Sequence, residues 1–165
     1  QQFRYQHVCA TDGTKLSTRR KVLSLRKVRA SAETKTLLAL SADASDVLEM
    51  RAALEAEGKP VALMELILPF ALFRGADRTE LESGDENLYS YYQREFGVTV
   101  VRMQERVCAR VADGATAKAL GLKKGHPLLL VERIAYTYGN RPVEIRRRLY
   151  EGTQHHYVYT HDELD

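Results

Sequence analysis

The chain has 165 residues, of which 44% are hydrophobic and 28% charged, and its net charge is +3 at neutral pH. This balance is typical of one globular domain over residues 1–165 with a sizeable core; it excludes a disordered chain and gives no reason to expect direct nucleic-acid binding. Two cysteines, Cys9 and Cys108, are too few for a disulfide framework and lack metal-ligand spacing, so we predict reduced thiols in a cytoplasmic protein. No signal peptide is apparent, and the longest apolar stretch, Val61–Phe73, is interrupted by Glu65, so we expect no membrane partner.

The chain starts abruptly with a strand-like segment, Phe3–Val8, which suggests an excised domain whose N-terminal neighbour is absent. The next candidate is Leu16–Lys21, which combines hydroxyl groups with three cations. Such a loop can bind an anion through Thr18, Arg19 and backbone amides. The alternative is a basic surface turn.

Residues 30–63 repeat at residues 112–145, without a gap, at a distance of 82 positions. Nine positions are identical, where average composition predicts about two by chance. The identical pairs are Ala30/Ala112, Thr34/Thr116, Leu38/Leu120, Leu40/Leu122, Leu48/Leu130, Arg51/Arg133, Ala53/Ala135, Pro60/Pro142 and Val61/Val143. We therefore predict one structural unit used twice, with the two copies packed face to face around a ligand cavity.

Each copy has the pattern helix, strand, turn, strand. Ser31 and Asp113 are the predicted helix caps, because their side chains can accept hydrogen bonds from first-turn amides. The predicted helices are Thr34–Leu38 and Thr116–Leu120, the strands Val47–Leu54 and Leu128–Tyr136, the turns Glu57-Gly58 and Gly139-Asn140, and the returning strands Val61–Leu68 and Val143–Tyr150.

A third helix is predicted between the copies, over Leu88–Phe96, with Asp85 as its cap and Gly97 at its end. Before it, Arg74–Gly84 is polar and indicates a surface loop. Phe3–Val8 and Val98–Arg110 can extend the sheet. The fold class is therefore α+β: a central antiparallel sheet from two pseudo-repeated halves, flanked by short helices.

Charged and polar side chains are concentrated on the last predicted strand of the second copy. Residues two apart on a strand share a face, so Glu144, Arg146, Arg148 and Tyr150 point one way and Arg147 the other. The arginines can hold a carboxylate or phosphate, while Glu144 takes a hydroxyl or amine. A solvated face with cross-strand ion pairs is the alternative. The equivalent positions of the first copy, Ala62, Met64, Leu66 and Leu68, are apolar, which favours a pocket with one apolar and one charged wall.

Arg51 and Arg133 occupy the same place in the two copies, amid apolar neighbours, where a lone arginine needs a partner. That partner is either a nearby glutamate or an anionic ligand, and we assign the ligand to Arg51. His155, His156 and His161 are predicted to be exposed polar residues rather than metal ligands. No nucleophile, metal or phosphate-loop motif is present, so we predict no cofactor and no catalytic residue.

Several separated motifs follow one another from the third predicted helix to the end of the second copy: Leu88-Tyr89…Phe96-Gly97, Ala119-Leu120-Gly121-Leu122, Gly125-His126-Pro127-Leu128-Leu129, Arg133-Ile134-Ala135-Tyr136, Arg141-Pro142-Val143-Glu144 and Tyr150-Glu151-Gly152. With these motifs the sequence resembles the UTRA domain, the effector-binding half of bacterial GntR-superfamily regulators of the HutC subfamily. The resemblance covers essentially the whole chain and is strongest over residues 86–152.

The resemblance implies a chorismate-lyase-like fold, a homodimer, and a winged helix-turn-helix domain before Gln1 that binds operator DNA. It implies that a small metabolite in the pocket controls a repressor. Family members that bind sugar phosphates use an Arg-x-Arg, a glutamate on the returning strand, and a Glu…Tyr pair. Here Arg51 matches the first arginine and Glu144 and Tyr150 match the pair, whereas Ala53 and Met64 replace polar residues. We therefore expect a more apolar effector with one anionic group.

Two other functions compete with this sensor. One is a chorismate-lyase-like enzyme that uses Glu144 as an acid on a small aromatic carboxylic acid. The other is a nucleic-acid-binding module acting through Arg146-Arg147-Arg148, for which steeply salt-dependent binding is the test.

Overall fold

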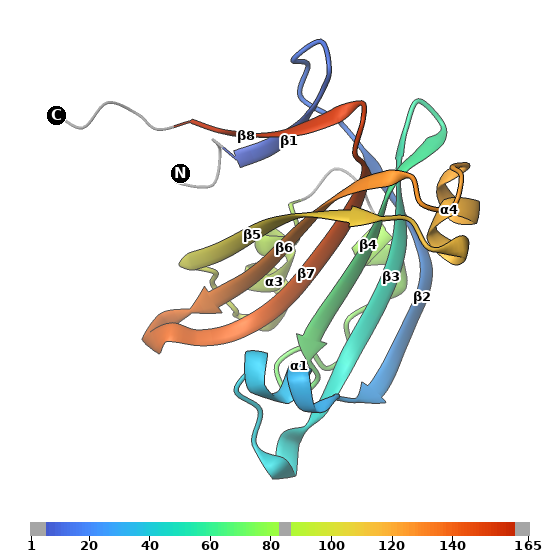
Figure 1. Cartoon of the computed structure of the whole chain (residues 1–165). Coiled ribbons are helices and arrows are strands. Elements are labelled where there is room, and N and C mark those ends of the chain that lie inside the picture. The colour runs from blue at the N-terminus through green and yellow to red at the C-terminus, as the bar shows by residue number, and fades with distance from the viewer. Residues whose placement is uncertain (1–5, 83–86, 161–165) are drawn as a thin grey trace, which may run out of the picture.

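A computed structural model of the chain describes residues 6–82 and 87–160, and its centre is a six-stranded antiparallel sheet (Figure 1). The strand order is β2-β3-β4-β7-β6-β5. The strands are β2 (Arg19–Arg29), β3 (Asp46–Ala56), β4 (Lys59–Pro69), β5 (Arg102–Val111), β6 (Pro127–Thr137) and β7 (Arg141–Glu151). The predicted α+β class with an antiparallel sheet is confirmed.

The two copies of the repeated unit lie side by side in this one sheet. Copy one is β2, α1 (Ala32–Leu37), β3 and β4; copy two is β5, α4 (Gly114–Leu120), β6 and β7. The first unit therefore begins with a strand, β2, that was not predicted, whereas β5 confirms that the Val98–Arg110 segment extends the sheet. The copies join where β4 pairs with β7, with Glu65 opposite Arg147, so the prediction of face-to-face packing is wrong. Edge pairing satisfies the open amide and carbonyl groups that each half would otherwise expose.

The spacing between the copies is not constant along the unit. Strands β4 and β7 are 82 positions apart, but β3 and β6 are only 81 apart, because the second hairpin turn, η3 (Tyr138–Asn140), is one residue longer than Glu57-Gly58. A shift of one residue moves a side chain to the other face of a sheet. The structural equivalent of Arg133 is therefore Ala52, and the predicted equivalence of Arg51 and Arg133 is wrong.

The predicted helix caps are confirmed in both copies. Ser31 accepts a hydrogen bond from the Thr34 amide at 3.2 Å, and Asp113 accepts one from the Thr116 amide at 2.7 Å. The third helix, α3 (Leu88–Phe96), is capped by the side chain of Asn87, which accepts from the Tyr89 amide at 3.0 Å. The predicted cap Asp85 lies outside the described residues.

Two segments differ from the sequence-based expectation. β1 (Gln6–Ala10) does not extend the large sheet but pairs with β8 (His155–Tyr159) in a separate two-stranded sheet; Phe3–Tyr5 lie outside the described residues. The predicted loop Arg74–Gly84 contains a helix, α2 (Arg78–Glu82). Its ends bind the backbone of edge strand β2 at Val22: Arg78 donates to the carbonyl at 2.5 Å, and Glu82 accepts from the amide at 2.8 Å. α2 thus covers an edge that would otherwise be open.

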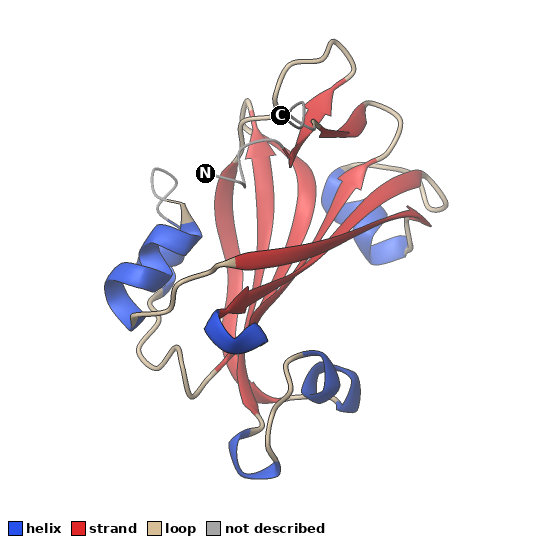
Figure 2. Ribbon diagram, turned by 90° about the vertical axis from the view of Figure 1, so that its left-hand side faces the viewer, coloured by secondary structure: helices blue, strands red, loops and turns tan. Residues whose placement is uncertain are grey.

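Helices lie on both faces of the sheet (Figure 2). One face, here called the α3 face, packs Met50, Leu66 and Val131 against Leu81 of α2 and Tyr92 of α3. On the other, the α4 face, α1 packs on Ile67 and Ile145, and α4 packs on Leu63 and Leu149. A short 3-10 helix, η2 (Ala42–Ala44), precedes β3. Among the described helices, none has the length and hydropathy needed to cross a membrane.

Gly152, just after β7, is a point where the backbone approach excludes a side chain. A Cβ atom there would lie 2.9 Å from the Pro127 carbonyl oxygen, the acceptor of the Gly152 amide. We expect Gly152→Ala to lower the free energy of unfolding by about 1–3 kcal/mol, measured by urea denaturation. Gly114→Ala, where the Cβ position is open, serves as the control and should lose nothing. Equal stability of the two variants would contradict the close approach.

Candidate functional site

The alternation predicted for β7 is present. Arg146, Arg148 and Tyr150 line a cavity on the α3 face, whereas Arg147 lies on the α4 face and pairs with Glu65 and Glu132. The α3-face side chains are not a solvated surface: Glu144 is 0% exposed and Tyr150 is 4% exposed.

Glu144 is a buried carboxylate whose oxygens are fully engaged. Arg146 donates to both oxygens, at 2.8 and 2.9 Å, and the Tyr92 hydroxyl donates at 2.6 Å. Burial raises the pKa of Glu144, but the charge and hydrogen bonds of Arg146 and the bond from Tyr92 outweigh it, so the net shift is downward. Burial lowers the pKa of Arg146, yet Glu144 and the tyrosines move it well above its ordinary value. Both groups are therefore charged, and Glu144 orients Arg146.

Glu105 of β5 is the second carboxylate on this face. It accepts from Arg133 Nε at 2.6 Å and from Arg148 at 3.4 Å, and it also accepts from the Tyr157 hydroxyl of β8. Burial and the Glu105 charge raise the pKa of Tyr157, so its hydroxyl remains a donor. Arg133 also donates to Tyr89 of α3 at 3.1 Å. Three arginines thus share two carboxylates.

Arg148 is the incompletely satisfied member of this network. Its Nε atom is buried and has no hydrogen-bond partner among the described residues, and its remaining bonds, to Glu105 and to the Tyr150 hydroxyl, are both 3.4 Å long. A buried donor without a partner costs about 1–3 kcal/mol, which an incoming acceptor can recover.

The cavity beside Arg148 has a volume of about 220 Å³. Cationic, apolar and hydroxyl-bearing side chains line it: Lys15, Arg20, Arg146, Arg148, Val8, Leu16, Leu54, Met64, Thr18 and Tyr150. Burial, and then the nearby Arg146 charge, lower the pKa of Arg20, as expected where cations crowd together. β1 and the loop after it form one wall. The arrangement can hold a small anion against an apolar surface.

Five of the seven predicted site residues come together here. Thr18, Met64, Arg146 and Tyr150 line the cavity, and Glu144 lies directly behind Arg146. Arg51 does not join them: it lies on the α4 face, its side chain 59% exposed, 3.5 Å from Glu49 and 3.9 Å from Glu65. The cause is the one-residue difference in spacing, which places Ala52 rather than Arg51 on the cavity side.

The prediction that Leu16–Lys21 is a loop is also corrected, because β2 begins at Arg19. The Arg19 side chain is exposed, and its neighbour Arg20 lines the cavity instead. Treating Leu16–Lys21 as the start of a strand would have separated the two by the alternation of faces. Sequence reasoning also missed Glu105, Tyr89 and Tyr92; their polar roles depend on contacts between distant segments, and the helical spacing indicated only a packing role for Tyr92.

Cysteine and histidine show no further site in the part of the chain described. Cys9 and Cys108 are free thiols, and no cluster of three His, Cys, Asp or Glu side chains there is arranged for a metal ion. His155 is not exposed as predicted: its side chain, at the start of β8, is only 10% exposed, and its Nδ1 atom lies 2.8 Å from the Glu151 carbonyl oxygen. His161 lies outside the described residues.

Comparison with known proteins assigns this fold to a class of domains found in transcriptional regulators. The family model of the UTRA domain matches residues 14–156, and the chain belongs to this family. A crystal structure of the ligand-binding domain assigned to a GntR-family transcriptional regulator from Bordetella bronchiseptica superposes with a TM-score of 0.86. It is 34% identical in sequence, over 97% of this chain and 99% of that one.

Two curated regulators are similar over part of their length. HTH-type transcriptional regulator Rv0792c of Mycobacterium tuberculosis is 31% identical over 61% of this chain and 38% of its own. HTH-type transcriptional repressor NagR of Bacillus subtilis is 25% identical over 64% of this chain and 42% of its own. The matches thus span about two-fifths of each relative. The chain is homologous to GntR-family regulators, and its resemblance to the UTRA domain is confirmed.

The ion pair of Glu144 and Arg146 yields a stability prediction. Glu144→Gln leaves a buried guanidinium without its counter-charge, so we expect a loss of about 3–5 kcal/mol in unfolding free energy at neutral pH. Glu65→Gln, in a partly exposed ion pair, is the control and should cost about 0–1 kcal/mol.

The same variant gives a pH test. Because the pKa of Glu144 lies below its ordinary value of 4.5, wild type holds its full advantage over Glu144→Gln above that pH and loses it as the pH falls through the lowered pKa. Denaturant unfolding above and below pH 4.5 measures this change. An advantage that grows on acidification would contradict the assigned charge state.

Proposed function

We propose that this chain is the effector-sensing domain of a bacterial regulator of the HutC subfamily. In this proposal a small anionic metabolite binds the α3-face cavity and controls operator DNA binding by an N-terminal winged helix-turn-helix domain outside this sequence. The observation that carries it is Arg148, whose buried Nε donor finds no partner in residues 6–82 and 87–160, and which lines a cavity together with three further cations. The similarity to transcriptional regulators of Mycobacterium tuberculosis and Bacillus subtilis supports the regulatory role.

The lining indicates the chemistry of the effector. An acidic group can accept parallel hydrogen bonds from Arg148, with Arg20 and Lys15 supplying further positive charge. Met64 and Leu54 offer an apolar surface to the rest of the molecule. The cavity is small, at about 220 Å³. We infer a compact carboxylic acid or amino-acid-like catabolite with one anionic group.

Glu105 links the cavity to the β1–β8 ribbon. An anion that engages Arg148 competes with Glu105, and the same carboxylate holds Tyr157 of β8, which pairs with β1. The effector thus has a route to bias the ribbon, as a switch requires differential affinity for two arrangements. We further propose that the regulator is a cytoplasmic homodimer and acts as a repressor.

The charge state of Glu144 argues against the enzyme hypothesis. A general acid must hold a proton and reach the substrate. Glu144 has a lowered pKa and lies behind Arg146, with Tyr92 on its other side. We therefore propose binding without turnover.

Calorimetry with a panel of small carboxylates and phosphates tests the proposed function. For an acid that binds wild type, Arg148→Gln should weaken affinity tenfold or more, about 1.4 kcal/mol, because the principal acceptor contact is lost. Arg51→Gln removes an arginine from the opposite face and should leave affinity unchanged. Equal affinities in both variants would remove Arg148 from the site, and product formation would favour the enzyme.

The link through Glu105 has its own test in the full-length regulator. Tyr157→Phe removes the hydroxyl that joins β8 to Glu105 but leaves the cavity lining intact. Effector affinity for the isolated domain should stay within about twofold, whereas the effector-induced change in operator affinity should shrink. An unchanged operator response, measured by fluorescence anisotropy, would exclude this route.

A further inference from the structure

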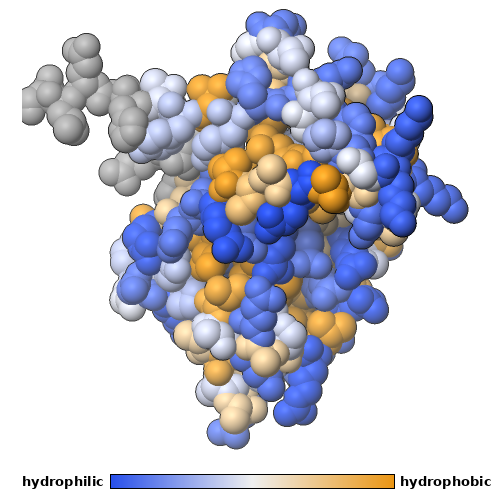
Figure 3. Space-filling model, viewed as in Figure 1, coloured by the Kyte–Doolittle hydropathy of each residue, from blue (hydrophilic) through white to orange (hydrophobic). Residues whose placement is uncertain are grey.

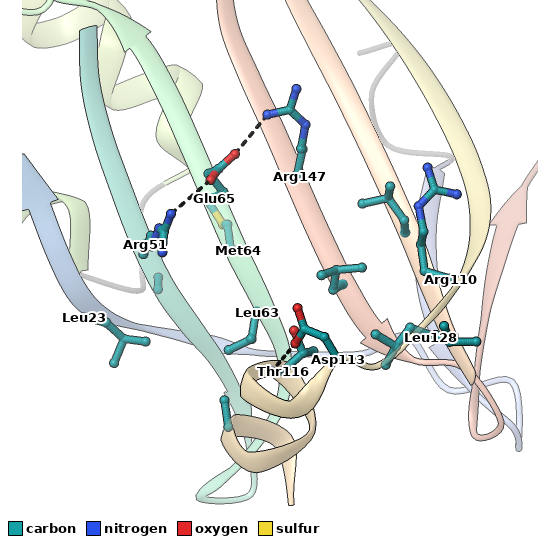
Figure 4. A pocket seen from close by; sticks show the side chains of 15 residues that line it. Leu23, Arg51, Leu63, Met64, Glu65, Arg110, Asp113, Thr116, Leu128 and Arg147 are labelled. Atoms are coloured by element: carbon teal, nitrogen blue, oxygen red, sulfur yellow. Dashed lines mark hydrogen bonds and ion pairs between the residues drawn. The ribbon is translucent and has the colours of Figure 1, made fainter. Parts of the chain in front are cut away.

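We propose that the α4 face carries a second small-molecule site, which takes an amphipathic molecule with an apolar body and one anionic group. This site does not depend on the α3-face cavity or on the function proposed for it. Its core is a hollow of about 490 Å³ between α4 and the strands (Figure 4). That volume lies within the range of roughly 300–1,000 Å³ typical of ligand pockets.

Leucine side chains from three strands make the hydrophobic lining. Leu63 of β4, Leu128 and Leu130 of β6, and Leu149 of β7 converge beside α4, as Figure 4 shows for Leu63 and Leu128. Leu128 and Leu130 are buried, so the lining is a fixed part of the core rather than a set of loose surface residues. Such a surface binds an alkyl or aryl group through the hydrophobic effect.

The two edge strands of the sheet both contribute to this hollow. Leu23 of β2 and Val111 of β5 line it, although β2 and β5 are at opposite edges of the sheet. Leu23 is 51% exposed and Val111 is 70% exposed. Figure 3, viewed from the side of Figure 1, shows hydrophobic side chains gathered beside strongly hydrophilic ones on this face. Binding gains about 25 cal/mol for each Å² of this apolar surface that an occupant removes from water.

Arg110 is the cation available to an anionic group. Its guanidinium donates to the carbonyl of the adjacent Ala109 at 2.9 Å, and none of the described carboxylates lies within ion-pair distance of it. Asp113, also on the lining, accepts from the Thr116 amide at the start of α4. The lining holds three arginines and two carboxylates, and this excess of one positive charge matches a monoanion.

A row of ion pairs bounds the hollow on the side away from α4. Glu65 lies 2.9 Å from Arg147 and 3.9 Å from Arg51, and Arg147 also binds Glu132 at 2.7 Å. Figure 4 shows the first two of these contacts running across the strands. A helix or strand of a partner would have to displace this row, whereas a small molecule fits between it and α4.

Octanoate is the probe for this site, with octanol and octylamine as controls that lack the negative charge. Calorimetry on the chain should show saturable binding of octanoate that Arg110→Gln weakens tenfold or more. Arg106→Gln, on the same strand but paired with Glu132 outside this hollow, should have no effect. Arg148→Gln should also have no effect, which separates this site from the α3-face cavity.

A blocking variant keeps the test independent of the charge. Ala119 is exposed on α4 and lines the hollow, so Ala119→Trp should fill it and abolish octanoate binding without disturbing the core. Ala115→Trp, exposed on the same helix but outside the lining, is its control.

Four results would overturn the second site: no saturable binding, equal binding of octylamine, unchanged affinity in Arg110→Gln and Ala119→Trp, or loss of binding in Arg148→Gln. Sedimentation provides a fifth. If Ala119→Trp, but not Ala115→Trp, dissociates a dimer, the hollow is covered by a second copy of the chain and not by a small molecule.

Discussion

The cost of burying charge governs the α3 face of this domain. Three arginines on β6 and β7 are largely removed from water: Arg133, Arg146 and Arg148. Burying a charge without a partner would cost a prohibitive amount of free energy. Glu144 and Glu105 neutralise two of these charges, and tyrosine hydroxyls of α3 and β8 add further hydrogen bonds to the network, which leaves only the buried Arg148 Nε without a partner among the described residues. The network holds α3 and β8 against the sheet, and the remaining positive charge lies at the cavity wall. Stability and ligand recognition on this face therefore have the same origin.

On the α4 face, a half-buried arginine is also neutralised by carboxylates, and the two nearest of these come from the neighbouring strands of the sheet. Arg147 lies between Arg146 and Arg148 in sequence, but the alternation of a strand turns it to the α4 face. There Glu65 and Glu132 pair with it from the neighbouring strands. Because all three consecutive arginines are committed to carboxylates within the domain, they are not a free basic patch. The run Arg146-Arg147-Arg148 thus offers little to a nucleic-acid backbone, which needs solvent-accessible cations.

Local sequence signals predicted the architecture well. Helix caps, turn glycines and alternation depend on a few neighbouring residues, so Ser31, Asp113 and the face of Arg146 could be predicted correctly. The position of Arg51 could not be, because one extra turn residue after β6 changes the spacing between the copies. A gapless comparison aligned Arg51 with Arg133 by identity, although pairing across the sheet sets the true equivalence.

Long-range partners were the other limit of sequence reasoning. Glu105 binds a residue 43 positions away, and Tyr92 binds one 52 positions away. Helical spacing predicts that the tyrosine ring is buried. It does not indicate whether the hydroxyl donates a hydrogen bond to a carboxylate. The docking of α2 on β2 is a contact of this kind too, since the polar composition of Arg74–Gly84 does not distinguish a surface loop from a short helix that caps a sheet edge.

The two cavities meet at the β4–β7 pairing, where the two copies of the unit join. Met64 of β4 contributes to both, and on β7 Arg148 and Tyr150 line one cavity while Arg147 and Leu149 line the other. A strand in a packed sheet moves as a unit, so a shift of β7 that accommodates one occupant also displaces the lining opposite. Any resulting change in affinity is reciprocal, because the coupling free energy between two sites is the same from either direction. Duplication of the half-domain thus yields one pairing of strands, β4 with β7, that contributes lining residues to both faces.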